Sequence, residues 1–487
     1  MLPPEPAATA VLMATFGTLM AVSVLCSRAT ERLGVPIVLL FLLLGMLAGA
    51  GLDFHDHRFA FRIGTAALVL ILLDGGLNTS LASIRKVAGP ASVLATLGVA
   101  ATTLLVALAA RAAGFGWREA FLLGAVVSST DAAAVFAVLR GSRLNLSKRI
   151  GLTLELEAGV NDPMAVILTA AITQSVVDGT PIGLGLALQV PLQLAIGSIA
   201  GVLVGRLGAA VLRRVHLRAA GLYPVLTLGI GLLAFGLTTL VGGSGFLAVY
   251  AAAVMVGNSE LPYRSGLTRI HDALAWLGQI SMFLMLGLLV VPADLLDVAG
   301  TGLALALFIA FVARPVATAL CLAPFRYTLR ETAYIGWVGL RGAIPIVLAT
   351  FPVMAGAPEA DRIFNVVFFV VVVNALVPGA TVRWITSLLR LDVAEPPQPA
   401  AVLEINSSRV LKGEITSFYV DETLAVCGTP LSAIPFPQGA AVVLVVRGEE
   451  LLAARGGTVL APGDHAYVFC RPEDRPYVQL LFGRPES

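Results

Sequence analysis

Long apolar stretches alternate with short polar or charged segments along the first 390 residues. About 20 mostly apolar residues cross a bilayer as a helix, and an isolated strand could not pair its backbone there. The pattern predicts an all-α polytopic membrane protein with about thirteen transmembrane helices. They are expected at residues 9–27, 34–51, 63–80, 88–110, 119–139, 150–176, 183–210, 221–240, 244–257, 270–291, 300–323, 331–351 and 363–388.

Composition supports a chain that lies mostly in lipid. Of the 487 residues, 57% are hydrophobic and 13% are charged, whereas a soluble domain carries roughly 25% charged residues. An ordinary soluble enzyme is therefore excluded. The net charge of +2 and the lack of a basic patch on a polar domain argue against a nucleic-acid partner.

The last 87 residues form a separate region, because they hold 17 of the 62 charged residues. The Pro-rich segment 392–400 predicts a linker between a membrane domain, 1–391, and a tail, 401–487. Strand signals in the tail predict a compact α+β domain, with His465 in a surface turn. These signals lie at 414–420, 441–446, 458–460 and 466–470.

Basic residues orient the predicted spans. If the N-terminus is outside, the inside loops carry 16 arginines and lysines and the outside loops carry 5. Cytoplasmic loops carry the excess of basic residues in membrane proteins. The bias therefore places the tail in the cytoplasm.

A few ionisable residues lie deep within apolar spans, where each costs at least about 2.5–3.5 kcal/mol on insertion. Such residues normally face a cavity and serve a function. Arg206 and Arg314 lie nearer to span ends and could extend to the membrane surface. The six that lie away from span ends are Asp74, Asp131, Glu155, Glu157, Asp162 and Arg341.

Asp131 ends the run Ser128-Ser129-Thr130-Asp131 in the fifth span. Such side chains compete for backbone hydrogen bonds, so the run can support an interrupted helix. The interruption would free carbonyl oxygens, which suit a hard monovalent cation. A cation site is therefore predicted beside Thr130 and Asp131.

Asp162 precedes Pro163, which removes a backbone donor and frees the carbonyl of Gly159. Glu157 and Asn161 are four residues apart on one helical face, and Asp162 lies on the adjoining side. Burial disfavours the charged carboxylate. A proton and a cation could then compete for Asp162, although an acid here could instead only pair with a base.

Arg341 needs a buried counter-charge, for which Glu157 and Asp131 are candidates. Gly339, Gly342 and Pro345 around it predict a second broken helix. The two broken helices are the fifth and twelfth spans, so they run in opposite directions. An inverted repeat of six spans, a linking span and six spans requires this, with the site where the breaks cross.

Asp74 precedes Gly75-Gly76 in the third span and could reach the same cavity. The alternative is an acid at a helix end that faces water. Glu155 is expected to lie off the cavity face.

The combination of Thr130-Asp131, Glu157 with Asn161-Asp162, and Arg341 between Leu340 and Gly342 resembles the NhaP-like branch of the Na⁺/H⁺ exchangers over residues 9–390. The resemblance implies the NhaA-like fold with two crossed discontinuous helices, a homodimer and a bacterial-type inner (cell) membrane location.

The same resemblance assigns roles to single residues. It makes Asp162 the ion- and proton-binding aspartate, with Asn161 beside it and Thr130 and Asp131 in the first unwound stretch. It pairs Glu157 with Arg341 and brings Asp74 toward the ion. Asn161 in place of a second aspartate implies electroneutral exchange. Ala158 stands where some relatives have a hydroxyl.

Residues 426–482 of the tail are similar to the TrkA-C (RCK-C) regulatory domain. Antiporters with this tail resemble the potassium/proton subgroup, which favours K⁺ over Na⁺ and implies no cofactor beyond the transported ions. The tail would bind a nucleotide-like ligand or dimerise.

Two rival functions follow from the same residues. A cation channel regulated by the tail is one, but no carbonyl filter such as Thr-Val-Gly-Tyr-Gly occurs. An intramembrane aspartyl hydrolase built on Asp131 and Asp162 is the other, and it leaves Arg341 unexplained. Cation/proton antiport without enzymatic activity is the function that the sequence favours.

Overall fold

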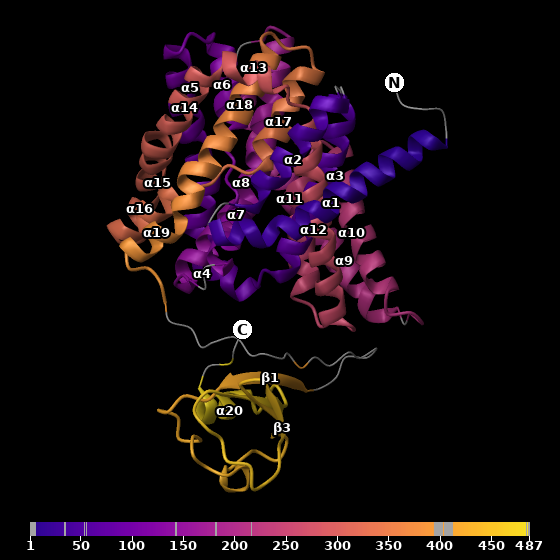
Figure 1. Cartoon of the computed structure of the whole chain (residues 1–487), viewed down its shortest axis with the longest axis vertical. Helices are drawn as coiled ribbons and strands as arrows, with labels where there is room; N and C mark the ends of the chain where they lie inside the picture. Colours follow the sequence, from indigo (N-terminus) through magenta and orange to yellow (C-terminus); the bar gives the residue numbers. More distant parts are fainter. Residues whose placement is uncertain are drawn as a thin grey trace. The chain divides into compact units, whose positions relative to one another are not determined.

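The computed structural model comprises a bundle of helices that extends to Val393 and a small domain that begins at Gly413 (Figure 1). Each is described by itself. The described residues are 6–33, 36–52, 54, 56–141, 144–180, 183–215, 217–393, 403, 413–483 and 485. Most of the predicted linker, 394–400, therefore lies outside the described residues.

The bundle is built from helices that follow the predicted apolar stretches, some of them joined end to end through short π-helical segments. The helices are α1 Ala7–Leu33, α2 Ile37–Leu52, α3 His57–Asn78, α4 Leu81–Val93, α5 Val99–Ala112, α6 Trp117–Val126, α7 Ala132–Gly141, α8 Lys148–Val177, α9 Leu184–Arg214, α10 Leu222–Leu240, α11 Gly245–Gly257, α12 Arg264–Leu288, α13 Pro292–Asp297, α14 Ala299–Phe308, α15 Arg314–Leu322, α16 Leu329–Trp337, α17 Ala343–Met354, α18 Ala360–Asn374 and α19 Ala380–Leu388.

Nine helices among the described residues are long and apolar enough to cross a membrane. Three further apolar helices are shorter and lie within α2, α11 and α17. The count of thirteen spans requires α2, α11 and two interrupted helices to cross as well, so it stays a prediction.

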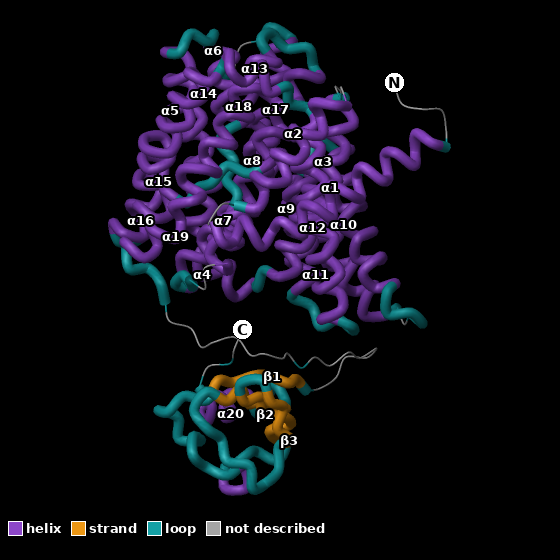
Figure 2. Tube along the Cα trace, viewed as in Figure 1, coloured by secondary structure: helices purple, strands orange, loops and turns teal. Residues whose placement is uncertain are grey.

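Two helices are interrupted inside the bundle, where Figure 2 shows loop segments among the helices. The first break separates α6 from α7 at residues 127–131, and the second separates α16 from α17 at 338–342. Both predicted interruptions are confirmed. Pro345 lies in the first turn of α17, where its missing N–H has no helical partner to lose.

The two breaks touch each other. The backbone N–H of Asp131 donates to the carbonyl of Leu340 at 2.8 Å. A Cβ atom on Gly342 would collide with the Asp131 carboxylate, so glycine is required for this approach. The crossing of discontinuous helices predicted from the sequence is therefore present.

Short π-helical segments interrupt two further helices at matching places. Leu94–Gly98 joins α4 to α5, and Ile309–Ala313 joins α14 to α15. These two segments occupy the fourth and eleventh predicted spans, which correspond in a repeat of six, one and six. A third π segment, Ala375–Gly379, contains Pro378 and precedes α19. The matching interruptions agree with the predicted inverted repeat.

The chain leaving the last helix pairs with an internal loop of the bundle. Leu146 and Asp392 form an isolated antiparallel bridge. The N–H of Val393 donates to the carbonyl of Asn145 at 2.8 Å. The loop between α7 and α8 is therefore bonded to the last described residues before the tail.

The tail domain is a four-stranded antiparallel sheet with the strand order β1-β4-β2-β3. Its strands are β1 Glu414–Tyr419, β2 Ala441–Arg447, β3 Glu450–Ala453 and β4 Asp464–Cys470. Helix α20, Arg475–Phe482, supplies Phe482 to the core formed with Phe418 and Val468. The α+β prediction is confirmed.

Two local predictions for the tail were wrong, and one strand was missed. Residues 458–460 form no strand of the sheet, because only Val459 makes an isolated bridge, to Pro430. The hairpin partner of β2 is instead β3, which the sequence did not indicate. His465 is 6% exposed within β4 rather than in a surface turn.

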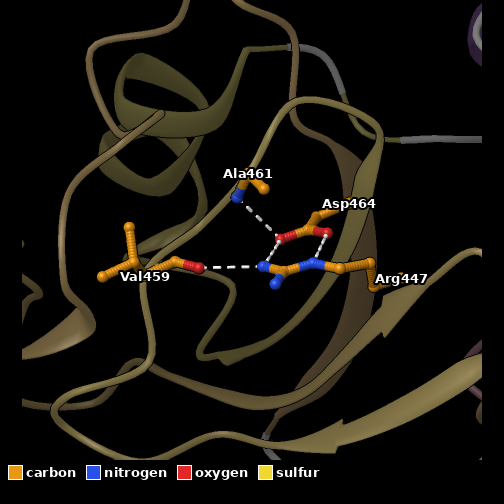
Figure 3. A network of polar contacts seen from close by, with 4 residues as sticks. All are labelled: Arg447, Val459, Ala461 and Asp464. Carbon is orange, nitrogen blue, oxygen red and sulfur yellow. Dashed lines mark hydrogen bonds and ion pairs between the residues drawn. The ribbon is translucent and has the colours of Figure 1, made fainter.

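An ion pair fastens the turn before β4 (Figure 3). The Arg447 Nε and Nη2 groups donate to the two carboxylate oxygens of the fully buried Asp464 at 2.7 and 2.8 Å. Asp464 also accepts from the N–H of Ala461, and Arg447 donates to the carbonyl of Val459. Hydrogen bonding to Asp464 raises the pKa of Arg447, so the guanidinium stays charged at physiological pH.

Candidate functional site

Asp162 lies at the middle of α8 and is 8% exposed. The hydroxyl of Ser129 donates to its Oδ1 atom at 2.6 Å. Ser129 comes from the break between α6 and α7, so the break supplies a donor that stabilises the carboxylate. The run Ser128-Ser129-Thr130-Asp131 was the signal for this contact, although the sequence did not single out Ser129.

Asn161 connects the same break to α8. Its amide nitrogen donates to the hydroxyl of Thr130. Its Oδ1 atom is buried and has no hydrogen-bond partner among the described residues. An amide oxygen that no described residue bonds therefore lies next along the chain to Asp162, and such oxygens are ligands for hard cations.

Asp131 stands next to this group but serves a local purpose as well. Its Oδ1 atom accepts from the N–H of Ala134 at 3.2 Å, in the first turn of α7. A carboxylate at a helix N-terminus stabilises the helix. The structure thus brings Thr130, Asp131, Asn161 and Asp162 together, as expected.

The ion pair of Glu157 differs from the expected one. The Nη2 atom of Arg314, the first residue of α15, lies 2.6 Å from Glu157 Oε1, and the side chains are 3% and 1% exposed. Arg341 instead donates from Nη1 to the carbonyl of Gly339 at 2.7 Å. The prediction of a Glu157–Arg341 pair, and of an Arg314 that extends to the membrane surface, is therefore corrected.

Gly339 explains why Arg314 reaches Glu157. A Cβ atom on Gly339 would collide with the Arg314 guanidinium, so the missing side chain leaves the space that Arg314 occupies. The π segment before α15 ends at Ala313 and alters the helical rotation at Arg314. The sequence did hold a signal for this pair, because an arginine inside an apolar span needs a buried counter-charge. That signal applied to Arg314 as well as to Arg341.

Asp74, in α3, makes its described contacts with other residues. It lines a cavity of about 170 Å³ together with Gly75, Ala134, Asp272 and Trp276, among others. Its Oδ1 atom accepts from Asn78 at 3.1 Å. Within the described ranges no hydrogen bond or ion pair joins it to Asp162, so its expected approach to the ion stays a prediction.

Glu155 is held by a hydrogen bond that the sequence did not indicate. Its Oε1 atom accepts from the hydroxyl of Thr79, which follows α3, at 3.0 Å. The phenol of Tyr250 in α11 donates to the same hydroxyl at 3.3 Å. A Cβ atom on Gly159 would lie 2.8 Å from the Tyr250 ring, so this glycine admits the ring against α8.

The site therefore combines one buried carboxylate, one buried amide oxygen, two hydroxyls and the open backbone of two crossed breaks. Hard monovalent cations bind to oxygen ligands of these kinds. The same carboxylate can take a proton, because burial favours its neutral form. Alternate binding of a cation and a proton is the chemistry that this arrangement can perform.

Comparisons with known proteins agree with this geometry. The model of the transmembrane sodium/hydrogen exchanger family matches residues 18–388, and the TrkA-C domain model matches residues 415–483. The K(+)/H(+) antiporter NhaP of Alkalimonas amylolytica is 38% identical over 479 residues, covering 97% of this chain and 83% of the relative. NhaP2 of Shewanella oneidensis is 40% identical over 480 residues, covering 96% and 83%.

A solved structure shares the fold of the bundle. The sodium proton antiporter MjNhaP1 from Methanocaldococcus jannaschii aligns with a TM-score of 0.66 at 22% identity. The alignment covers 78% of this chain and 99% of that protein.

Proposed function

The chain belongs to the sodium/hydrogen exchanger family, cation/proton antiporters that are membrane transporters rather than enzymes, and we propose that it exchanges K⁺ for H⁺ through Asp162. The choice of K⁺ is supported by the NhaP and NhaP2 relatives, which are named K(+)/H(+) antiporters. Na⁺ is the alternative cation. Family membership also removes the channel and the aspartyl hydrolase as rivals.

Asp162 would bind the cation and the proton in turn. In the cation-loaded state, the charged carboxylate, the Asn161 amide oxygen and carbonyls of the two breaks would provide the ligands. In the proton-loaded state, the neutral carboxyl would require no cation. Asn161 cannot titrate, so one proton would replace one monovalent cation and the exchange would be electroneutral.

The observation that carries this proposal is the Ser129–Asp162 hydrogen bond between α8 and the first break. It holds a buried carboxylate at the crossing of two helices that lack regular backbone bonding. Ion sites in transporters form at such interruptions, because unwound backbone supplies ligands there.

Asp162→Asn in proteoliposomes tests the mechanism. We expect loss of cation-driven proton movement while the purified variant keeps the melting temperature of the wild type. Asp178→Asn is the matched control, because Asp178 caps the exposed end of the same helix. Normal exchange by Asp162→Asn would rule out the proposed role.

Ion selectivity is tested by adding K⁺, Na⁺, Li⁺ and Rb⁺ in turn to vesicles that hold a pH gradient. We expect K⁺ to collapse the gradient at the lowest concentration. A stronger response to Na⁺ would assign the protein to sodium/proton exchange instead.

We further propose an inner-membrane location with the N-terminus outside and the tail in the cytoplasm. The arginine and lysine bias of the loops supports this orientation. Labelling of a cysteine introduced at Glu473, an exposed acid of the tail, should then require a permeant reagent in intact cells.

We also propose that the transporter is a homodimer and that its TrkA-C domain binds a small nucleotide-like ligand or dimerises. The domain match at 415–483 supports a regulatory role for the tail. Mass photometry of the purified chain tests the dimer, and thermal shifts with ATP and AMP test the ligand.

A further inference from the structure

One face of α8 carries polar residues far beyond Asp162. Glu155, Asp162 and Thr169 follow each other at seven-residue intervals, and Thr173 lies eighteen residues after Glu155. At 100° per residue, seven residues fall about 20° short of two turns, and eighteen complete five turns. These four side chains therefore share one face over about 27 Å, close to the roughly 30 Å hydrocarbon thickness.

Thr169 and Thr173 are buried, and neither hydroxyl has a partner among the described residues. They are 0% and 5% exposed. Neither hydroxyl has a hydrogen bond within the part of the chain that the structure describes. An unsatisfied buried hydroxyl costs about 1–3 kcal/mol, so two of them on one helix face require an explanation.

Several other threonines of the bundle donate to the backbone of their own helix. Thr153, on α8 itself, donates to the carbonyl four residues earlier at 2.7 Å. Thr239 in α10 and Thr386 in α19 do the same at 2.8 and 2.7 Å. This bond is the usual arrangement for a threonine within a helix. Thr169 and Thr173 make no such bond among the described residues, so their hydroxyls keep an unused capacity for hydrogen bonding.

Helix α3 shows a related pattern. Thr79, the residue directly after α3, donates to Glu155, and fourteen residues earlier, within α3, Thr65 has a hydroxyl that is buried without a described partner. Helix α17, which follows the second break, packs against both α3 and α8. Hydroxyls without described partners therefore lie on both α3 and α8, two of the helices that pack against α17.

We propose that the hydroxyls of Thr169 and Thr173 line the half of the ion path that leads from Asp162 to the C-terminal end of α8. This inference rests on the proposed antiport function and extends it. The ligand is a monovalent cation that keeps part of its water shell, since hydroxyl oxygens can replace lost waters. Glu155, held by Thr79, serves the opposite half of the path.

Removal of single hydroxyls tests the path. We would reconstitute Thr169→Val, Thr173→Val and the double variant in one orientation and measure the apparent KM for K⁺ from each side. When K⁺ is added on the membrane side that holds the C-terminal end of α8, the apparent KM should rise about five-fold for each single variant. This factor corresponds to the loss of about one hydrogen bond. From the other side it should stay within about two-fold, whereas Glu155→Gln should show the reverse sidedness.

Thr238→Val is the matched control. Thr238 in α10 is 1% exposed and also has no described hydrogen-bond partner. Its loss should leave both apparent KM values unchanged, which separates a path from a general effect of buried hydroxyls. Equal changes from both sides, or wild-type KM values in the double variant, would overturn the inference.

A second measurement does not depend on transport rates. Thr173→Cys should react with a membrane-impermeant thiosulfonate applied from the side where α8 ends, and K⁺ should slow the reaction. The wild type, with its native cysteines Cys26, Cys321, Cys427 and Cys470, sets the background. An unreactive but transporting Thr173→Cys would refute the path.

The experiments distinguish failure of the antiport function from failure of the threonine-lined path. If the wild type does not exchange cations for protons, the antiport function falls. If the wild type exchanges and Asp162→Asn does not, but the threonine variants behave as the control does, only the path is wrong.

Discussion

Arg314→Met tests whether Glu157 is neutralised by Arg314 or by Arg341. Methionine keeps much of the arginine stem but removes the charge, which leaves the Glu157 carboxylate buried without the partner that lies 2.6 Å away. The substitution therefore tests the Glu157–Arg314 pair, which the structure shows in place of the predicted Glu157–Arg341 pair.

The magnitude follows from the burial of both groups. Removing one member of a buried pair costs about 3–5 kcal/mol, because the remaining charge is left uncompensated. Arg341 is 2% exposed and still acts electrostatically on Glu157, which favours the lower figure. At roughly 2 °C per kcal/mol for a large domain, about 3 kcal/mol lowers the melting temperature by about 6 °C.

The assay is a pair of double-mutant cycles on purified protein, one with Arg314→Met and Glu157→Gln and the other with Arg341→Met and Glu157→Gln. Such cycles isolate the coupling between two residues. The Arg314 double variant should recover most of the lost stability, since a neutral pair of similar volume is well tolerated. Arg206→Met, at an exposed arginine of α9, is the control and should change little.

Two results would refute this reasoning. One is an Arg314→Met melting temperature equal to that of the Arg206→Met control. The other is a larger coupling of Glu157 to Arg341 than to Arg314, which would restore the pair that the family resemblance implied.

Three further outcomes are expected. Gly342→Ala should lower the exchange rate at least about ten-fold in proteoliposomes, because its Cβ would push the two breaks apart, whereas Gly300→Ala, with open space around it, should not. Asn161→Asp should make the exchange electrogenic, so that K⁺ evokes a current on a supported membrane, whereas the wild type should give none. Absence of a current in the variant would count against the proposed one-for-one stoichiometry. Arg447→Met should destabilise the tail by about 2–3 kcal/mol. The loss is smaller than for a fully buried pair, because the Arg447 side chain is 43% exposed. Limited proteolysis of the full chain should then cleave the tail of the variant faster than that of the wild type. Unchanged proteolysis would mean that Asp464 finds other partners.

The broken helices could be predicted because their causes are local. Hydroxyl side chains at 128–130 and the residues Gly339, Gly342 and Pro345 weaken helices wherever they occur. The seven-span separation then fixed their opposite directions. The same local logic located Asp162 beside Pro163, and the structure adds the Ser129 donor to it.

The partner of Glu157 could not be predicted, because it depends on space that other segments create. Arg314 reaches Glu157 only across Gly339, a residue 25 positions further along the chain. Nothing in the sequence around Arg314 indicates that vacant volume. Sequence reasoning treated nearness to a span end as exposure, but the structure buries this side chain.

Strand β3 could not be predicted from the sequence for a different reason. Its residues Glu450, Leu451, Leu452 and Ala453 have little intrinsic preference for a strand. The segment becomes one because Gly448, at a positive φ of 58°, turns the chain back along β2. Tertiary pairing thus overrides local preference at the edge of the sheet.

The bridge between Leu146 and Asp392 ties the end of the bundle to the loop that precedes α8. The chain reaches the tail only through Val393, which is bonded to Asn145. The two ends of the loop that holds Asn145 continue into α7 and α8. One of these helices begins at the first break and the other holds Asp162, so the last described segment of the bundle is anchored to the loop that joins both walls of the site.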